Sequence, residues 1–301
     1  MDDRFARNIA LFGGEGQRRL LETSVAIIGV GGLGIHVVQQ LAFLGVGKFT
    51  LIEPEELDTT NRNRYVGSRF DDPIPGTLKV DIAERLIRSV DPAVPILKVP
   101  RSLLSQEAFA AVRASQWVFS CLDQDGIRLV LAELCLAYRV KLVDLASDVV
   151  TDGARLHYGG RVCVCQGGNG CLMCMHVIDP NEAAMQFEND QAIQDRRTIY
   201  GVDPAVLGRT GPSVVSINGV VASLGVTEFM VAVTGLRAPQ RHLEYYGEAG
   251  KVMVSQDLAV ADCWYCRNVF GAGHAAEVER YLAACPKHPF GNGDSPSNGS
   301  G

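Results

Sequence analysis

Apolar runs and helical patterns alternate along the first half of the chain. Short β-branched and aromatic runs predict strands at residues 25–28, 48–52, 96–99, 117–121 and 141–146. Apolar residues at helical spacing predict helices between them, at residues 35–44, 79–90, 102–114 and 127–138. Strands that alternate with helices in this way are typical of an α/β fold, here a Rossmann-like, doubly wound and mostly parallel sheet.

The pattern changes after about residue 150. Residues 154–165 and 241–254 predict further strands, which we expect to continue the sheet in antiparallel fashion. Between them, residues 213–234 carry Glu228 as their only charge and approach the length that spans a bilayer. Serine, asparagine and glycine residues interrupt this stretch. We therefore expect no membrane span but a buried helix, whose small residues could pack against a second subunit.

A glycine-rich turn joins the first strand to the first helix of the sheet. Gly29, Gly31, Gly32 and Gly34 fit the pattern G-x-G-x-x-G, and Glu53 ends the second strand about 20 residues later. Such glycines allow phosphate to approach the backbone at a helix N-terminus, and the acid suits a ribose hydroxyl. This unit predicts nucleotide binding, and an NAD-dependent oxidoreductase is one alternative.

Charged residues follow the ends of two predicted strands. Glu55 and Arg64 come after the second strand, and Asp123 comes directly after the fourth. Because the carboxyl ends of parallel strands meet at one edge of a sheet, we expect a polar ligand site at this edge.

Composition restricts the class of protein only mildly. The chain has 301 residues, 47% of them hydrophobic and 21% charged, with a net charge of −6. This charge gives no reason to expect nucleic acid or an anionic membrane as a partner. The N-terminus is charged and does not resemble a signal peptide. Nine cysteines without such a signal indicate a reducing, cytoplasmic compartment, with thiols or metal rather than disulfides.

Four cysteines have the spacing of a metal site. Cys171 and Cys174 form one C-x-x-C pair, and Cys263 and Cys266 form another. Two such pairs can complete a tetrahedral Cys₄ site, so we predict structural Zn²⁺, with a redox dithiol as the rival. Four thiolates leave no open position, so the ion would tie the C-terminal segment to the chain without taking part in catalysis. We expect Cys163 and Cys165 to face opposite sides of one strand, and hence not to bind one ion together.

Several motifs in order resemble the ThiF/MoeB/HesA/ubiquitin-activating superfamily of adenylating enzymes. They are the arm RFARN (4–8), GQRRL (16–20), GVGGLG (29–34), NRNR (61–64), G-x-x-K (76–79), Asp-Gln (123–124) and the two C-x-x-C pairs. The resemblance covers residues 4 to about 266. It implies a homodimeric ATP-dependent adenylyltransferase that activates the C-terminal carboxylate of a ubiquitin-like or sulfur-carrier protein, or of a short peptide.

The resemblance also implies roles for individual residues. Glu53, where relatives more often have Asp, would hold the ATP ribose, with Glu55 in the same nucleotide site. Asn61, Arg64 and Lys79 would contact the phosphates. Asp123 would bind Mg²⁺ and act in catalysis, and Arg7 would reach the partner subunit's active site.

The resemblance implies a domain plan for the chain. Residues 1–284 would form one adenylation domain, and residues 285–301, rich in glycine, serine, asparagine and proline, a disordered tail. The domain would comprise an N-terminal arm (1–24), a nucleotide-binding half (25–150) and a substrate-binding and zinc half (151–284). A polar crossover loop would occupy about residues 176–212.

The chain departs from the pattern of its relatives in this crossover. Many relatives carry an acyl-accepting cysteine there, whereas residues 176–212 contain none. We expect the protein to stop at the adenylate or to pass it directly to an external nucleophile. The alternative acceptors are Cys163, Cys165 and Cys285. A binding module that has lost catalysis is a third possibility, beside the adenylyltransferase and the oxidoreductase.

Overall fold

The computed structural model describes residues 3–152, 155–168, 170–185, 213–255, 260 and 262–283. The predicted tail (285–301) and residues 186–212 of the predicted crossover lie outside these ranges.

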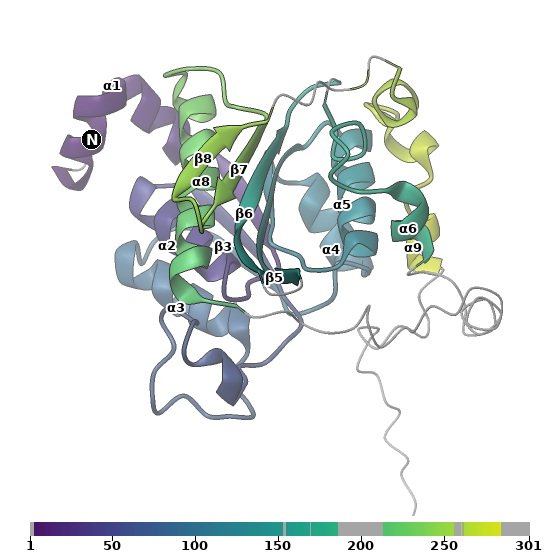
Figure 1. Cartoon of the computed structure of the whole chain (residues 1–301). Helices are drawn as coiled ribbons and strands as arrows, with labels where there is room; N and C mark the ends of the chain where they lie inside the picture. Colours follow the sequence, from purple (N-terminus) through teal and green to yellow (C-terminus); the bar gives the residue numbers. More distant parts are fainter. Residues whose placement is uncertain are drawn as a thin grey trace, which may run out of the picture.

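One eight-stranded sheet runs through the molecule, in the order β3-β2-β1-β4-β5-β6-β7-β8 (Figure 1). The strands are β1 (Ser24–Ile28), β2 (Lys48–Ile52), β3 (Ile96–Val99), β4 (Trp117–Ser120), β5 (Lys141–Asp152), β6 (Arg155–Cys165), β7 (His242–Tyr246) and β8 (Lys251–Val254). The first five strands pair in parallel, and β6, β7 and β8 continue the sheet in antiparallel fashion. The predicted fold class is therefore confirmed.

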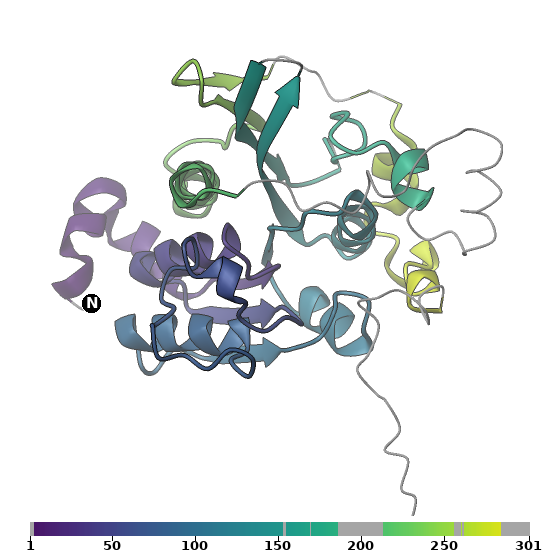
Figure 2. The same cartoon turned by 60° about the horizontal axis from the view of Figure 1, so that its bottom comes forward.

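Helices cover both faces of the sheet (Figures 1 and 2). One face carries α1 (Ala6–Leu21), α2 (Gly34–Leu44), α3 (Lys79–Val90) and α8 (Val215–Thr234). The other carries α4 (Gln106–Arg113), α5 (Asp125–Ala137), α6 (Pro180–Met185) and α9 (Arg280–Ala283). Short helical turns complete the fold: η1 (Asp3–Phe5), η2 (Thr59–Asn61), η4 (Tyr265–Val269) and η5 (Gly273–Ala276). The sheet thus separates two hydrophobic clusters, one under each helical layer.

The long apolar stretch is a core helix, as predicted. By length and composition α8 could cross a membrane, but 56% of its apolar window is buried within the molecule. Its small residues pack internally: a Cβ on Gly225 would lie 2.4 Å from the Leu145 side chain. The single charge of this helix, Glu228, is buried and paired with Arg237 at 2.6 Å.

Three details differ from the sequence predictions. β5 continues past residue 146 to Asp152, because its polar second half gains its backbone partners from β6. α4, predicted at residues 102–114, begins at Gln106. Ser105 caps it by accepting a hydrogen bond from Ala108 N (3.2 Å). The expectation for Cys163 and Cys165 is wrong: residues two apart on a strand share a face, and both lie in the cluster under α5.

Candidate functional site

The glycine turn lies at the carboxyl edge of the sheet, between β1 and β4. Gly29 has φ +84°, and a Cβ there would lie 2.7 Å from the Cys121 carbonyl oxygen. A Cβ on Gly34 would lie 2.1 Å from the Gly29 carbonyl oxygen. Only glycine fits at these two positions. A Cβ on Gly31 would meet nothing within 4 Å, so the turn presents bare backbone toward open space. Such a surface can receive a phosphate beside the N-terminus of α2.

Two acids and a lysine lie beside the turn, where β2 ends. Glu53 is 6% exposed and accepts a hydrogen bond from Glu55 N at 3.0 Å. Burial raises the pKa of Glu53 to about 7, although the positive charge of Lys79 opposes this rise. Lys79, the first residue of α3, is itself buried, and its ammonium group is paired with Glu55. The Tyr65 hydroxyl, 2.8 Å from the Val30 carbonyl and 3.1 Å from that of Lys79, joins α3 to the glycine turn.

The segment after β2 brings an arginine over the glycine turn. Asp58 and Asn61 cap η2 reciprocally: Thr60 N donates to Asp58 Oδ1 (2.7 Å), and Asp58 N donates to Asn61 Oδ1 (3.2 Å). Arg64 follows and donates to Thr60 O at 2.5 Å. Its aliphatic stem lies 3.3 Å from the position of a Cβ on Gly32. The capped turn thus holds the stem of Arg64 against Gly32, with the guanidinium bonded to Thr60 O.

Asp123 approaches the same place from β4. In the chain, Asp123 comes shortly after Cys121, which packs against Gly29 and Gly34. α5 begins just beyond it, at Asp125. Asp123 is exposed, and it forms no hydrogen bond or ion pair with any residue that the structure describes. A carboxylate without a protein partner suits a hard cation such as Mg²⁺.

Asn218 of α8 also lies at this site, although no motif in the sequence marks it. It is 1% exposed, and its Nδ2 lies 3.0 Å from the position of a Cβ on Gly32. Ser147 of β5 donates to its Oδ1 at 2.7 Å, and its Nδ2 donates to Ser213 at 3.1 Å. An asparagine within a largely apolar stretch that is predicted to be buried was the available signal, because a buried amide needs partners.

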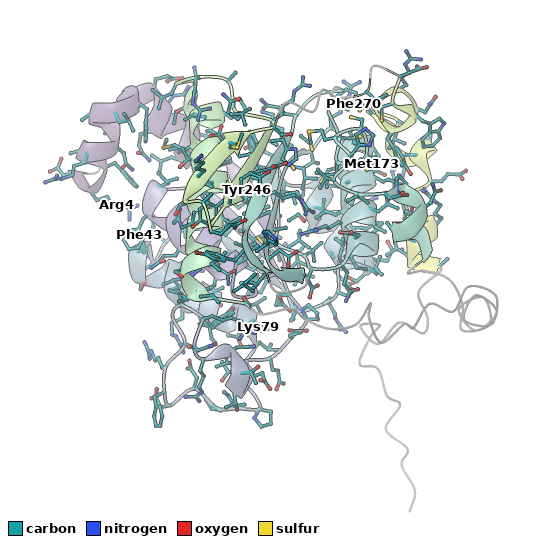
Figure 3. All side chains as sticks on the ribbon, viewed as in Figure 1. Arg4, Phe43, Lys79, Met173, Tyr246 and Phe270 are labelled. Carbon is teal, nitrogen blue, oxygen red and sulfur yellow. The ribbon has the colours of Figure 1, made fainter. Side chains whose placement is uncertain are left out.

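Arg7 does not join this group within its own chain. It is exposed on α1 and has no hydrogen bond or ion pair with a residue in the described part of the chain. The neighbouring arm is held at the far ends of α2 and α3: Phe5 packs at Gly45, and Arg4 pairs with Asp91 at 2.6 Å. Both helices start at the glycine-turn edge, and lengths of 11 and 12 residues carry them about 16 and 18 Å away. Figure 3 shows the corresponding separation of Arg4 from Lys79.

The four predicted metal ligands meet in space. Their sulfur atoms all lie within 4.8 Å of one another. The Cys171 and Cys263 sulfurs are 3.6 Å apart, and those of Cys174 and Cys266 are 3.9 Å apart. A tetrahedral site with zinc–sulfur bonds of about 2.3 Å requires sulfurs about 3.8 Å apart. The donor set and its spacing therefore fit Zn²⁺.

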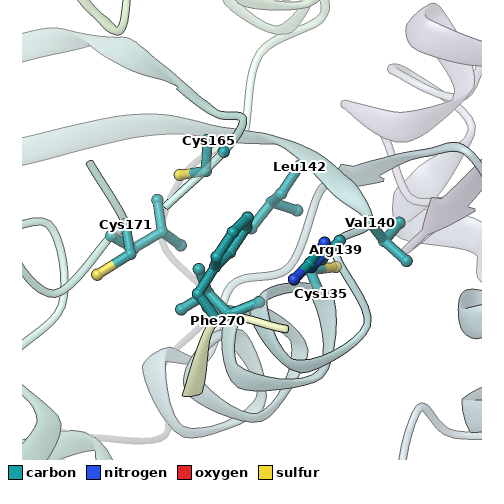
Figure 4. Close-up of a pocket in the computed structure, with 11 residues that line it drawn as sticks. Cys135, Arg139, Val140, Leu142, Cys165, Cys171 and Phe270 are labelled. Atoms are coloured by element: carbon teal, nitrogen blue, oxygen red, sulfur yellow. The ribbon is translucent and has the colours of Figure 1, made fainter. Parts of the chain in front are cut away.

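A small cavity beside this cluster is not a second site. Phe270, Cys165, Cys171 and Cys135 line it, together with Arg139 (Figure 4). Its volume of about 20 Å³ is enough for about one water molecule and far too small for a nucleotide.

The alternative acceptor cysteines show no sign of activation. Cys163 and Cys165 are buried, and burial raises the pKa of both thiols well above the usual value. A thiol with a raised pKa is a poor nucleophile. Cys285 lies outside the described residues.

Comparisons with known proteins show the family and the fold of this chain. Residues 5–261 match the ThiF family. The chain is 29% identical over 223 residues to the adenylyltransferase and sulfurtransferase MOCS3 of Drosophila yakuba, covering 68% of this chain and 47% of MOCS3. It is 28% identical over 214 residues to the sulfur carrier protein adenylyltransferase of Thermus thermophilus, covering 68% of this chain and 73% of that protein. The chain thus spans about half the length of MOCS3.

Solved structures share the fold. The crystal structure of E. coli MccB with ATP superposes with a TM-score of 0.68, covering 88% of this chain and 75% of MccB. The two sequences are 17% identical, and a likeness at this level concerns the fold alone.

Proposed function

Because this chain belongs to the ThiF family, we propose that it is an ATP-dependent adenylyltransferase of the cytoplasm. Its substrate would be the C-terminal carboxylate of a ubiquitin-like or sulfur-carrier protein, or of a peptide. The names of its relatives include a sulfur carrier protein adenylyltransferase and a SAMP-activating enzyme E1. The residues that carry the proposal are Arg64, whose stem lies against Gly32, Lys79, which is paired with Glu55 after β2, and Asp123, which follows β4.

The proposed reaction explains why cations are gathered there. A carboxylate oxygen attacks the α-phosphorus of ATP, the bond to the β-phosphate oxygen breaks, and acyl-AMP and pyrophosphate result. An anion must approach an anion, so positive charge beside the phosphates lowers the barrier. Arg64 and Lys79 would supply this charge. Mg²⁺ held by Asp123 would neutralise further charge on the phosphates.

The remaining residues would position the nucleotide. Glu53 would accept hydrogen bonds from the ribose hydroxyls, and Glu55 would release Lys79 to the phosphates. Asn61 would contact the phosphates from η2. Gly29, Gly31, Gly32 and Gly34 would give them close access to the backbone and to the N-terminus of α2. The NAD-dependent alternative gives no role to Arg64 and Lys79.

Pyrophosphate exchange tests the proposal directly. We expect the protein to exchange labelled pyrophosphate into ATP when a suitable C-terminal carboxylate is present, and to bind Mg–ATP in preference to NAD. Asp123→Ala, Arg64→Ala and Lys79→Ala should each lower the exchange rate by about 100-fold or more, because each removes charge stabilisation in the transition state. Glu107→Gln, an exposed change on α4, is the control. Exchange at the wild-type rate in all three variants would refute these roles.

We propose that the chain works as a homodimer. An open groove of about 360 Å³ lies between α1, α2 and α8, and its lining includes Asn8, Phe43 and Met230. Leu11 and Phe43 are 62% and 61% exposed on this side. A second copy of the chain would cover this apolar side and bring its own Arg7 toward the site of the first, as the resemblance implies. In its own chain Arg7 lies at the opposite edge of the sheet.

The adenylate would leave without a thioester on the crossover. Residues 176–212 contain no cysteine, and the thiols at Cys163 and Cys165 are buried. An external nucleophile would therefore take the acyl group directly from AMP. The Zn²⁺ site would serve structure alone, since four thiolates complete its coordination.

A further inference from the structure

Arg161 stands out as a half-buried arginine without a firm partner. Its side chain is 28% exposed, and its nearest acidic oxygen is Asp144 Oδ2 at 4.0 Å. Its guanidinium donates no hydrogen bond to any residue in the described part of the chain, and its Nε is buried without a partner. Arg85 and Arg237, by comparison, donate to carboxylates at 2.6–2.7 Å.

The residues around Arg161 explain why it remains charged but unbound. Asp144 is fully buried, accepts from the Ser120 hydroxyl at 2.6 Å, and leaves Oδ2 without a hydrogen bond. Glu244 stands opposite Arg161 in the β6–β7 register, yet its carboxylate accepts a hydrogen bond from the Tyr246 hydroxyl. Asp144 thus attracts the guanidinium without occupying its donors. A guanidinium with free donors is suited to oxygen acceptors of a ligand.

The sheet register places Arg161 near the reaction centre. Asp144 pairs with Ser120 of β4, and Ala146, two residues further along β5, pairs with Arg161. Arg161 is therefore level with the residues that follow β4, in the segment 121–124 that carries Asp123 (the Asp123 loop). Two strand spacings separate β6 from β4, which corresponds to about 10 Å across the sheet.

Only one face of the sheet is open at this level. The α8 face is filled, since a Cβ on Gly160 would lie 2.5 Å from the Val221 side chain. Arg161 and Asp144 lie on the other face, where Arg128 of α5 reaches Asp144 (3.5 Å) and Asp125 (3.1 Å). α5 begins only at Asp125, so Arg161 stays accessible beyond its end.

We propose that Arg161 binds the tail of the acyl substrate about three residues before the reacting carboxylate. An extended chain advances about 3.3 Å per residue, so three residues span the distance from Arg161 to the Asp123 loop. The ligand group is an oxygen acceptor of the tail, either a backbone carbonyl or an acidic side chain. Asp144 acts as a positioning residue behind Arg161. This inference rests on the proposed adenylation of a C-terminal tail.

Pyrophosphate exchange with peptide pools tests the inference. The probe is a pool of decapeptides with a free carboxyl group and random residues at the last five positions. Arg161→Met should raise KM for the pool by about ten- to hundredfold, the effect of one charge-assisted hydrogen bond. KM for ATP should stay at the wild-type value, and the melting temperature should fall by no more than a few degrees, because the side chain gives up no hydrogen bond and only the ion pair with Asp144 at 4.0 Å. Arg161→Lys should restore part of the affinity.

Controls separate this inference from the proposed function. Lys251→Met removes an exposed cation from the same face, two strands further out, and should leave KM for the pool unchanged. A second pool without Asp and Glu tells a backbone carbonyl from an acidic side chain. Wild-type exchange with an unchanged KM in Arg161→Met, or a melting temperature lowered by more than a few degrees, overturns the role of Arg161 alone. No exchange by the wild type with the pool would overturn the adenylation of peptide tails itself.

Discussion

Glu53 is buried, although its position after a strand indicates only a polar site residue. Its place after β2 marks it as a candidate ribose ligand, but only packing shows that it is buried beside Lys79. Burial disfavours the charged carboxylate, so its pKa in the folded protein rises from 4.5 to about 7. The folded state then holds the proton more tightly than the unfolded chain. The contribution of protonated Glu53 to the free energy of unfolding is therefore complete below about pH 4.5 and is lost as the pH rises toward 7.

Glu53→Gln should therefore stabilise the protein at neutral and higher pH. The amide keeps the shape and can still accept the hydrogen bond from Glu55 N, but it carries no buried charge. We expect the free energy of unfolding at pH 8 to exceed that of the wild type by up to about 3 kcal/mol. The difference should shrink as the pH falls toward 5, as measured by urea unfolding across this range. Glu107→Gln, an exposed acid, should show no such trend, and a gain in Glu53→Gln that is independent of pH would contradict this account.

The cluster of four cysteines connects elements that are distant in the sequence. It joins the segment after β6 to the turn that leads into η4, two segments about 90 residues apart in the sequence. A second tie lies further along, where Arg280 and Tyr281 bond to the buried Glu133 of α5. The two ties hold the C-terminal segment against the α5 face of the sheet.

Loss of one thiolate should loosen this segment. Cys266→Ser should lower the zinc content, measured by mass spectrometry of the metal, from about one ion per chain to nearly none. Loss of the metal should remove about 3 kcal/mol or more of stability and lower the melting temperature by about 6 °C or more. Cleavage by trypsin within residues 262–283 should become faster. Cys135→Ala, a buried thiol outside the cluster, should keep its zinc, and unchanged zinc in Cys266→Ser would exclude this site.

At the scale of the whole molecule, Arg7 is far from the site that the resemblance assigns to it. The arm lies at the far ends of α2 and α3, on the side of the exposed Leu11 and Phe43. The role in catalysis that the resemblance implies for Arg7 would therefore require a second copy of the chain, as proposed above.

Mixed dimers test this action. Arg7→Ala and Asp123→Ala should each be inactive in pyrophosphate exchange. Mixed in equal amounts and allowed to exchange subunits, they should recover about a quarter of wild-type activity, since half of the dimers are mixed and each has one complete site. Phe43→Glu in both chains should abolish the recovery and give monomers in analytical ultracentrifugation. Absence of recovery in dimers shown to be mixed would count against action in trans.

The sequence alone determined most of the elements and proposed most of the polar groups of the candidate site. Local periodicity, the glycine spacing and the C-x-x-C pairs are properties of adjacent residues, so β1, α2, α3 and the cysteine cluster could be predicted. The switch from parallel to antiparallel pairing also followed from the change of pattern near residue 150.

Tertiary structure decided what depends on distant partners. The second half of β5 exists because β6 pairs with it, and Asn218 reaches Gly32 only because α8 packs beside α2. The raised pKa of Glu53 and the weakly partnered state of Arg161 depend on burial and on neighbours more than 15 residues away in the sequence. Such properties arise from long-range packing, which no local pattern encodes.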